Sequence, residues 1–270
     1  MVRVALAGAA GRMGRRIAQV LDQTEGALLA AGFEAPGHPL VGQPLSVATG
    51  VAGLEGTLGD DAAAALEQAQ VLIDFTAPEA TLANLEAAAR AGKAAVVGTT
   101  GLSSKQQALV AEVAGQVPVV FSPNMSVGMN LMFQLVRQMA EVLGEDYALE
   151  LVEAHHDQKK DAPSGTAVKL LDQLAAARGW KRQEVCVYGR QGMVGPRPKR
   201  EIGVGVIRGG DVVGEHTVYF LAQGERLELT HRAHSRDTFA RGAVRAAQWV
   251  AQQPPGLYDM LDVLGLEKGK

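Results

Sequence analysis

The side chains best suited to chemistry lie close together between residues 153 and 166. Two histidines, two lysines and three acidic residues occur in this stretch, which runs Glu153-Ala154-His155-His156-Asp157-Gln158-Lys159-Lys160-Asp161-Ala162-Pro163-Ser164-Gly165-Thr166. Histidine is the side chain that exchanges a proton most readily near neutral pH. In an extended chain His155 and His156 point to opposite sides, so both face one ligand only if a strand ends or bends there. The cluster therefore predicts proton transfer at the end of a strand.

The end of the same stretch predicts an anion site. Pro163–Thr166 precede a segment with helical periodicity and present backbone N–H groups at its start, with Lys159 or Lys160 as a counter-charge. Two alternatives stay open at this point, because a run of charges can be a solvated loop and paired histidines can bind a metal. The close ligand spacings of zinc sites are missing, so we predict no metal.

The remaining histidines show no comparable pattern. His216, His231 and His234 fall on later predicted strands, where packing and surface roles are the commoner ones. His38 falls in a loop rich in glycine and proline. We therefore assign none of the four to catalysis or binding.

A glycine-rich turn near the amino terminus predicts dinucleotide binding. Gly8-Ala9-Ala10-Gly11-Arg12-Met13-Gly14 follows an apolar strand and opens a helix, with Ala10 where the common fingerprint has its second glycine. A pyrophosphate needs close backbone approach, free amide N–H groups and the positive end of a helix dipole. A glycine turn can also be purely steric, but the residue that follows the second strand supports binding.

That residue is Glu34, about 20 residues past Gly14, where an acidic side chain accepts hydrogen bonds from ribose hydroxyls. Its charge repels a 2′-phosphate and so favours NADH. Arg12, Arg15 and Arg16 lie near enough in sequence to offset that repulsion, so NADPH stays open.

Two further loops follow predicted strands. Gly98-Thr99-Thr100-Gly101 ends the fourth strand and Ser122-Pro123-Asn124-Met125 ends the fifth. Ligands of doubly wound sheets bind outside the carboxyl ends of the strands. Hydroxyl and amide groups there can contact nicotinamide or ribose, although each loop alone is ordinary loop chemistry.

The elements that carry these residues fall into two groups. Through residue 121, apolar runs alternate with amphipathic helical segments; the runs are 2–7, 27–33, 71–75, 94–97 and 117–121. Continuous apolar strands bounded by such helices are typical of a parallel sheet covered on both faces. We expect an α/β fold with a Rossmann-like, doubly wound parallel sheet, and a dinucleotide-binding domain over residues 1–125.

The second group has strands that follow strands. A long amphipathic helix over residues 126–143 precedes strand alternation at 149–154 and three later strands, of which 212–221 and 226–233 form a hairpin. This order implies a mixed or antiparallel sheet in a second, α+β domain. We assign residues 126–236 to this substrate-binding and oligomerisation domain, and expect the helical segment in 237–270 to return to the first.

Composition excludes several classes of function. The chain has 270 residues and 28.3 kDa, with 26 basic and 29 acidic side chains, a balance that argues against a nucleic-acid partner. The single cysteine, Cys186, excludes an internal disulfide and a cysteine-cluster zinc site and fits a reducing, cytoplasmic location. No apolar segment reaches about 18 residues, so we expect a soluble protein with no membrane span.

Together the motifs resemble the 4-hydroxy-tetrahydrodipicolinate reductase family, formerly called dihydrodipicolinate reductase. The resemblance runs from residue 2 to about residue 264, and the histidine motif is its most specific part. The matching segments are Gly11-Arg12-Met13-Gly14, Asp74-Phe75-Thr76, Gly98-Thr99-Thr100-Gly101, Asn124-Met125-Ser126-Val127-Gly128, Glu153 to Lys159, Asp161 to Thr166, Gly214-Glu215-His216-Thr217 and Phe239-Ala240-Arg241-Gly242-Ala243.

The resemblance implies a reaction and an assembly. Hydride passes from NADH or NADPH to a cyclic, unsaturated dicarboxylate, giving tetrahydrodipicolinate in the diaminopimelate route to lysine. Members are cytoplasmic homotetramers whose second domains assemble a shared sheet. A small dicarboxylate is the implied ligand, with no nucleic-acid or membrane partner.

The resemblance also implies roles for individual residues. His155 is the proton donor and acceptor, Lys159 is a second proton donor that also binds substrate, and His156, Gly165 and Thr166 bind the substrate carboxylates. The residues that would hold the cofactor are Gly8, Ala9, Ala10, Gly11, Arg12, Met13, Glu34, Gly98, Thr99, Thr100, Ser122, Pro123, Asn124 and Met125.

Three departures and two rival functions remain. Ala35 and Ala77 stand where some members carry arginines, which weakens the case for NADPH, and Ala10 replaces a glycine. One rival is a regulatory protein that senses a dinucleotide without transferring hydride, although a sensor needs no proton donor. The other is a related dehydrogenase that acts on another amino-acid precursor.

Overall fold

The computed structural model describes residues 1–266, which divide into two compact units. Unit 1 comprises residues 1–127 and 236–266, and unit 2 comprises residues 128–235. Each unit has its own sheet and its own buried core, so each is described separately.

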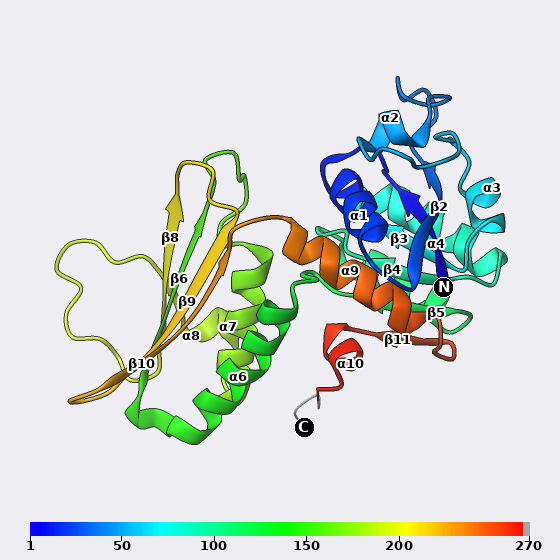
Figure 1. Ribbon diagram of the computed structural model, residues 1–270. Helices are drawn as coiled ribbons and strands as arrows, with labels where there is room; N and C mark the ends of the chain where they lie inside the picture. Colours follow the sequence, from blue (N-terminus) through cyan, green and yellow to red (C-terminus); the bar gives the residue numbers. More distant parts are fainter. Residues whose placement is uncertain (267–270) are drawn as a thin grey trace. The chain divides into compact units, whose positions relative to one another are not determined.

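Unit 1 is built on a six-stranded parallel sheet with strand order β11-β5-β4-β3-β1-β2. Its elements, most of them labelled in Figure 1, are β1 (Val2–Ala7), α1 (Arg12–Asp22), β2 (Ala27–Phe33), α2 (Leu45–Thr49), α3 (Ala62–Glu67), β3 (Val71–Asp74), α4 (Pro78–Arg90), β4 (Ala94–Val97), α5 (Ser104–Ala114), β5 (Pro118–Phe121), α9 (Asp237–Val250), β11 (Gly256–Tyr258) and α10 (Met260–Leu264).

Both faces of this sheet are covered by helices. Alternate residues of β1 enter separate cores: Leu6 packs with Ile17 of α1 and Val244 of α9, whereas Ala5 packs with the core that holds Leu85 of α4 and Val110 of α5. Strands buried on both faces have continuous apolar runs, as in Val71-Leu72-Ile73 of β3. The predicted α/β doubly wound sheet is confirmed.

The strand order reverses beside β1. β1 pairs with β2 on one side and with β3 on the other, so the connections that leave their carboxyl ends run to opposite sides of the sheet. Such a reversal opens a crevice at that edge, which is where ligands of this sheet type bind.

Unit 2 is built on a five-stranded mixed sheet with strand order β10-β9-β6-β8-β7. β6 pairs antiparallel with β9 and parallel with β8, and β9 and β10 form the predicted hairpin. Its elements are α6 (Val127–Leu143), a 3-10 turn (Gly144–Asp146), β6 (Ala148–His155), α7 (Gly165–Ala177), α8 (Arg182–Val185), β7 (Cys186–Tyr188), β8 (Ile202–Arg208), β9 (Gly214–Leu221) and β10 (Arg226–Ala233). The predicted mixed α+β sheet is confirmed.

Helices α6 and α7 cover one face of this sheet (Figure 1). Burial along β6 alternates residue by residue, so Leu149, Leu151, Glu153 and His155 lie on the covered face. The chemistry-bearing residues of β6 therefore continue the row that forms the core.

Short elements are the ones that sequence periodicity did not predict. The structure adds α8, β7, β11 and α10, each three to five residues long, and a five-residue helix, α2, between β2 and α3. Elements of this length show too few repeats for a period to be recognised. No helix among residues 1–266 is long and apolar enough to cross a membrane.

Candidate functional site

The glycine turn of unit 1 is shaped by close backbone packing. Gly8 has φ +66°, a left-handed conformation that favours glycine. A Cβ on Gly14 would lie 2.1 Å from the Gly8 carbonyl oxygen and 2.7 Å from the Cα of Ala9. The first turn of α1 thus presses directly on the loop that follows β1, which brings its backbone amides to the carboxyl edge of the sheet.

A cavity of about 630 Å³ opens at this edge. Its walls come from the segments after β1, β2 and β3, together with the first half of α4. The lining residues are Gly8, Gly11, Arg12, Met13, Gly14, Phe33, Glu34, Ala35, Pro36, Asp60, Ala62, Phe75, Thr76, Ala77, Ala80, Ala83 and Asn84. The cavity therefore lies at the point where the strand order reverses.

Glu34 and Asp60 place two carboxylates in the cavity wall. Glu34 Oε1 accepts a hydrogen bond of 3.0 Å from the Ala10 N–H, which joins the end of β2 to the glycine turn. The N-cap of α3 is Asp61, whose carboxylate accepts from the Ala63 N–H at 2.8 Å, whereas its neighbour Asp60 lies in the cavity wall.

The predicted cofactor residues divide into two sets. Gly8, Gly11, Arg12, Met13 and Glu34 line the cavity. The rest follow β1, β4 and β5 without lining it in the described part of the chain; they are Ala9, Ala10, Gly98, Thr99, Thr100, Ser122, Pro123, Asn124 and Met125.

A buried carboxylate connects the two sets. Asp74, fully buried at the end of β3, accepts hydrogen bonds through Oδ1 from the Thr76 N–H (2.9 Å), from Thr81 Oγ1 (3.0 Å) and from Thr99 Oγ1 (3.2 Å). Its Oδ2 accepts from Asn84 Nδ2 at 2.7 Å. Because Thr76 and Asn84 line the cavity, Asp74 fixes the loop after β4 to the cavity wall.

The histidine cluster lies in unit 2, where β6 ends. β6 stops at His155, and the His156 N–H donates to the Val212 carbonyl at 2.7 Å in the following bend. His155 is buried and His156 is half-buried. The strand therefore ends between His155 and His156, which is the condition under which both rings can face one ligand.

Glu153 is the centre of this cluster. Its Oε2 lies 2.6 Å from His155 Nδ1 and accepts from Arg208 Nη1 at 2.7 Å, and its Oε1 accepts from Arg208 Nη2 at 2.7 Å and from the Ser164 N–H at 3.0 Å. Burial opposes ionisation of Glu153, but the hydrogen bonds from its neighbours lower the pKa of this carboxyl from 4.5 to about 2. A fully buried carboxylate is thus ionised and paired.

His216 joins the cluster from β9. Its ring packs edge-on against the His155 ring with centroids 5.2 Å apart, and its Nε2 lies 3.1 Å from Ser164 Oγ. Burial, together with the neighbouring His155, lowers the pKa of His216 from 6.5 to about 3. The packing role expected for His216 is correct, but the residue it packs on is the predicted proton donor.

The predicted anion site lies at the start of α7. Ser164 is the N-cap and accepts from the Ala167 N–H at 3.1 Å, Gly165 is exposed, and a Cβ on Gly165 would meet nothing within 4 Å. The exposed Gly165 leaves the helix start accessible to a ligand, as a carboxylate-binding helix terminus requires.

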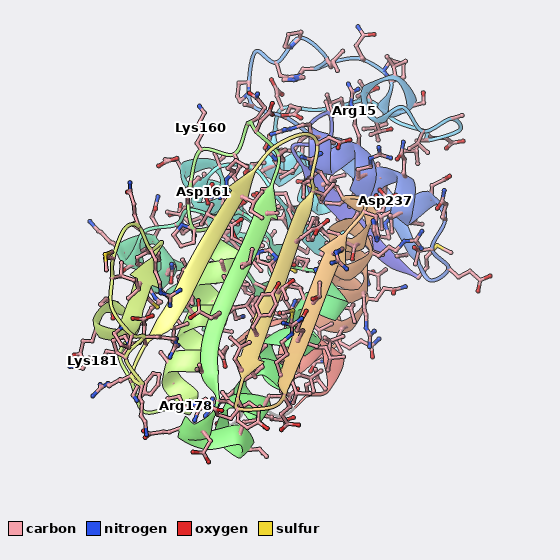
Figure 2. The ribbon with its side chains drawn as sticks, turned by 90° about the vertical axis from the view of Figure 1, so that its left-hand side faces the viewer. Arg15, Lys160, Asp161, Arg178, Lys181 and Asp237 are labelled. Carbon is pink, nitrogen blue, oxygen red and sulfur yellow. The ribbon has the colours of Figure 1, made fainter. Side chains whose placement is uncertain are left out.

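The two lysines of the motif differ in their surroundings. Lys159 Nζ lies 2.9 Å from Asp161 Oδ1 and its side chain is 20% exposed. Lys160 is exposed, and in Figure 2 it extends outward from the loop that follows β6, the loop that also holds Asp161. The geometry supports Lys159 over Lys160 as the lysine of the site.

Arg208, His216 and Asp60 are the site residues that sequence reasoning did not find. Arg208 stands opposite His155 in the register of β6 and β8, although the two are far apart in sequence. The register of two strands that are distant in sequence leaves no local pattern in either strand. Only a homologue alignment or the folded structure therefore reveals such a pair. Among the described residues, no group of three or more histidine, cysteine, aspartate or glutamate side chains is arranged to hold a metal ion.

Comparison with known proteins identifies the family. The family model described as dihydrodipicolinate reductase, N-terminus, matches residues 2–125, and the one described as dihydrodipicolinate reductase, C-terminus, matches residues 128–264. The chain belongs to the dihydrodipicolinate reductase family. The predicted resemblance is confirmed.

Curated members of the dihydrodipicolinate reductase family match along their whole length. The 4-hydroxy-tetrahydrodipicolinate reductase of Geotalea uraniireducens is 51% identical, covering 98% of this chain and 100% of its own. That of Geobacter sulfurreducens is 49% identical, covering 99% and 100%.

Solved structures agree on the fold. A dipicolinate-bound dihydrodipicolinate reductase from Paenisporosarcina sp. TG-14 superposes with a TM-score of 0.76 at 23% identity, covering 97% of this chain and 98% of its own. A scyllo-inositol dehydrogenase from Lactobacillus casei with bound NAD(H) and scyllo-inositol superposes with a TM-score of 0.59 at 14% identity, covering 100% and 91%. At these identities the likeness concerns the fold alone.

Proposed function

We propose that this chain reduces 4-hydroxy-tetrahydrodipicolinate to tetrahydrodipicolinate with a reduced nicotinamide dinucleotide, in the diaminopimelate route to lysine. Family membership supports the reaction, and the geometry of each unit supports the assignment of one ligand to each unit. In this proposal unit 1 binds the dinucleotide and unit 2 binds the dicarboxylate. The observation that carries it is that one carboxylate, Glu153, contacts both a histidine and the amide-bearing start of a helix.

The cavity of unit 1 fits a dinucleotide. Gly8 allows the left-handed turn after β1, and Gly11 and Gly14 let the turn and the first turn of α1 pack closely on it; a Cβ on Gly11 would lie only 3.1 Å from the Gly8 carbonyl oxygen. Glu34 stands where it can accept from ribose hydroxyls. When bound, the reduced nicotinamide supplies the hydride. The proposed cofactor residues are those named in the sequence analysis, from Gly8 to Met13, Glu34, and the loops after β4 and β5.

The residues of unit 2 supply the proton and hold the substrate. Loss of the 4-hydroxyl group as water gives a conjugated imine, and reduction of that imine adds a hydride at one side and a proton from an acid. We assign this proton to His155, with Lys159 as the second donor. A doubly negative substrate is attracted by the Lys159 ammonium and by the start of α7, where Gly165 and Thr166 present backbone amides. His156 completes the carboxylate-binding set.

We propose NADH as a cofactor at least as good as NADPH. Two carboxylates, Glu34 and Asp60, line the cavity, and Arg12 is the one lysine or arginine among its described lining residues. Ala35 and Ala77 also line it, at the positions where a cation would favour a 2′-phosphate. A phosphate beside two carboxylates is repelled.

We further propose a cytoplasmic homotetramer that assembles through unit 2. The free cysteine Cys186 fits a reducing compartment, and among residues 1–266 helices cover one face only of the five-stranded sheet. A sheet with one uncovered face is suited to pairing with a copy of itself.

Single substitutions test the catalytic assignment. His155→Ala is expected to lower kcat by about 10²–10⁴-fold, the usual contribution of a positioned acid, while the dissociation constant of NADH stays within about twofold. Lys159→Ala is expected to raise KM for the substrate and lower kcat.

Lys160→Ala is the matched control, because it removes the same charge one residue away from an exposed position. Steady-state rates at 340 nm and NADH fluorescence titration give both quantities. Normal turnover in His155→Ala would remove this histidine from the mechanism. A defect in Lys160→Ala but not in Lys159→Ala would mean that Lys160, one residue further along, is the lysine of the site.

A further inference from the structure

We propose that Glu153 is a positioning residue that holds the proton donor and the carboxylate-binding helix start in one fixed geometry. The inference rests on the proposed function, which assigns proton transfer to His155 and substrate binding to the start of α7. Glu153 touches neither substrate nor cofactor in this scheme and acts through His155 and Ser164.

One oxygen of Glu153 selects the tautomer of His155. An ionised carboxylate is only an acceptor, so at 2.6 Å from Oε2 the Nδ1 of His155 carries the proton. Nε2 is then the nitrogen that exchanges a proton with the substrate. A Cβ at residue 214 would lie 3.1 Å from this Nε2, and Gly214 leaves that space open.

The other oxygen of Glu153 fixes the helix start. Its Oε1 accepts from the Ser164 N–H at 3.0 Å, and Ser164 is the N-cap of α7. The N-cap precedes Gly165 and Thr166 directly, so the position of their amides follows from this contact. Ser164 Oγ is in turn held 3.1 Å from His216 Nε2.

Arg208 holds the Glu153 carboxylate in the orientation in which one oxygen contacts His155 and the other contacts Ser164. Its two Nη atoms donate to the two oxygens of Glu153 at 2.7 Å each, a bidentate pair that fixes the carboxylate plane. Arg208 Nη2 also donates to the Asp161 carbonyl at 2.9 Å, which ties down the loop between β6 and α7. The guanidinium, the carboxylate, the imidazole and the helix start thus form one connected unit.

The groups that surround His155 come from three strands and one loop. Glu153 shares β6 with it, His156 follows directly after the strand, Arg208 faces it from β8, and His216 packs on it from β9. The other charges near these rings belong to Lys159 and Asp161, which form an ion pair with each other. Glu153 is the carboxylate in direct contact with the His155 ring, so its removal is what changes the stability of the charged imidazole.

The test is Glu153→Gln in the full-length protein. The amide keeps the shape but is neutral, and it can donate to Nδ1, which reverses the tautomer. We expect kcat to fall by about 10²-fold, as when other histidines lose an orienting carboxylate, and KM for the substrate to rise. The alkaline limb of the kcat profile is expected to move to lower pH, which a purely structural role would not cause.

Glu150→Gln is the matched control. Glu150 lies on the same strand, faces the opposite side of the sheet and is paired with two arginines, Arg190 and Arg197. Its replacement is expected to leave the pH profile and KM unchanged. NADH binding reports on unit 1 and is expected to be normal in both variants.

The outcomes separate the inference from the proposed function. An unchanged His155→Ala enzyme overturns the proposed site itself. If His155→Ala loses activity but Glu153→Gln has normal kcat, KM and pH profile, the positioning role of Glu153 is overturned and the proposed site stands. If Glu153→Gln fails to fold, Glu153→Asp keeps the charge but is one methylene too short to reach both His155 and Ser164; wild-type kcat and KM in that variant overturn the proposal.

Discussion

His155 and His216 are neighbouring buried imidazoles with opposite electrostatic surroundings. His155 contacts a carboxylate at 2.6 Å, whereas the contact of His216 is a hydroxyl at 3.1 Å. Burial and the adjacent His155 lower the pKa of His216 to about 3, so this ring is neutral at physiological pH. One ring is therefore held by an ionised carboxylate, and the other packs against it as a neutral ring.

The buried His216 makes stability depend on pH. Its pKa is about 6.5 unfolded and about 3 folded, so the unfolded chain binds more protons in between, and stability falls as pH falls from about 6.5 to about 3. His216→Gln is expected to remove up to about 1.4 kcal/mol per pH unit from that slope. Urea unfolding at several pH values and fixed protein concentration measures it.

His234→Gln is the control for that series. His234 is exposed on the segment that follows β10, and its replacement leaves His216 in place, so the slope is expected to persist. A slope that is equal in wild type and His216→Gln would contradict the burial argument.

At the scale of elements, the carboxyl ends of three strands determine the cofactor cavity. The turn after β1, Glu34 after β2 and Thr76 after β3 converge because β2 and β3 lie on either side of β1. Asp60 joins them from the segment before α3. The choice between NADH and NADPH is thus made by residues that are distant in sequence and close in the sheet.

This arrangement predicts the cofactor ratio. The wild-type kcat/KM with NADH is expected to equal or exceed that with NADPH, and Glu34→Gln is expected to raise kcat/KM with NADPH by about tenfold, the equivalent of about 1.4 kcal/mol of lost repulsion. Parallel steady-state assays with both cofactors measure this.

Glu55→Gln removes an equal charge from an exposed position outside the cavity lining and is expected to leave the ratio unchanged. A hundredfold preference of the wild type for NADPH would overturn the role given to Glu34.

At the scale of the whole molecule, the uncovered face of unit 2 decides the assembly we propose. Ile207 pairs with Ala154 in the register of β6 and β8, one residue away from the covered row that holds Glu153, and it is 56% exposed. An exposed isoleucine on an uncovered sheet face is an expected contact between copies.

Light scattering coupled to size exclusion is expected to give four times the chain mass of 28.3 kDa. Ile207→Glu is expected to lower that mass, because a charge on an apolar interface is costly. Leu109→Glu, which changes an exposed leucine on α5 of unit 1, is expected to keep it. A wild-type chain that elutes as a monomer would contradict the tetramer.

The fold class and family follow from the sequence because their signals are local. Apolar runs, a glycine turn and the histidine motif each lie within about 15 consecutive residues, and the strands β1, β2, β4 and β10 begin and end where the pattern predicts. The catalytic and cofactor assignments stay predictions that the variants above test. What the tertiary structure alone decided are the long-range pairs: Arg208 and His216 brought onto Glu153 and His155, and Asp60 brought beside Glu34. Strand order and register create these pairs, and neither leaves a periodic trace in the residues that it joins.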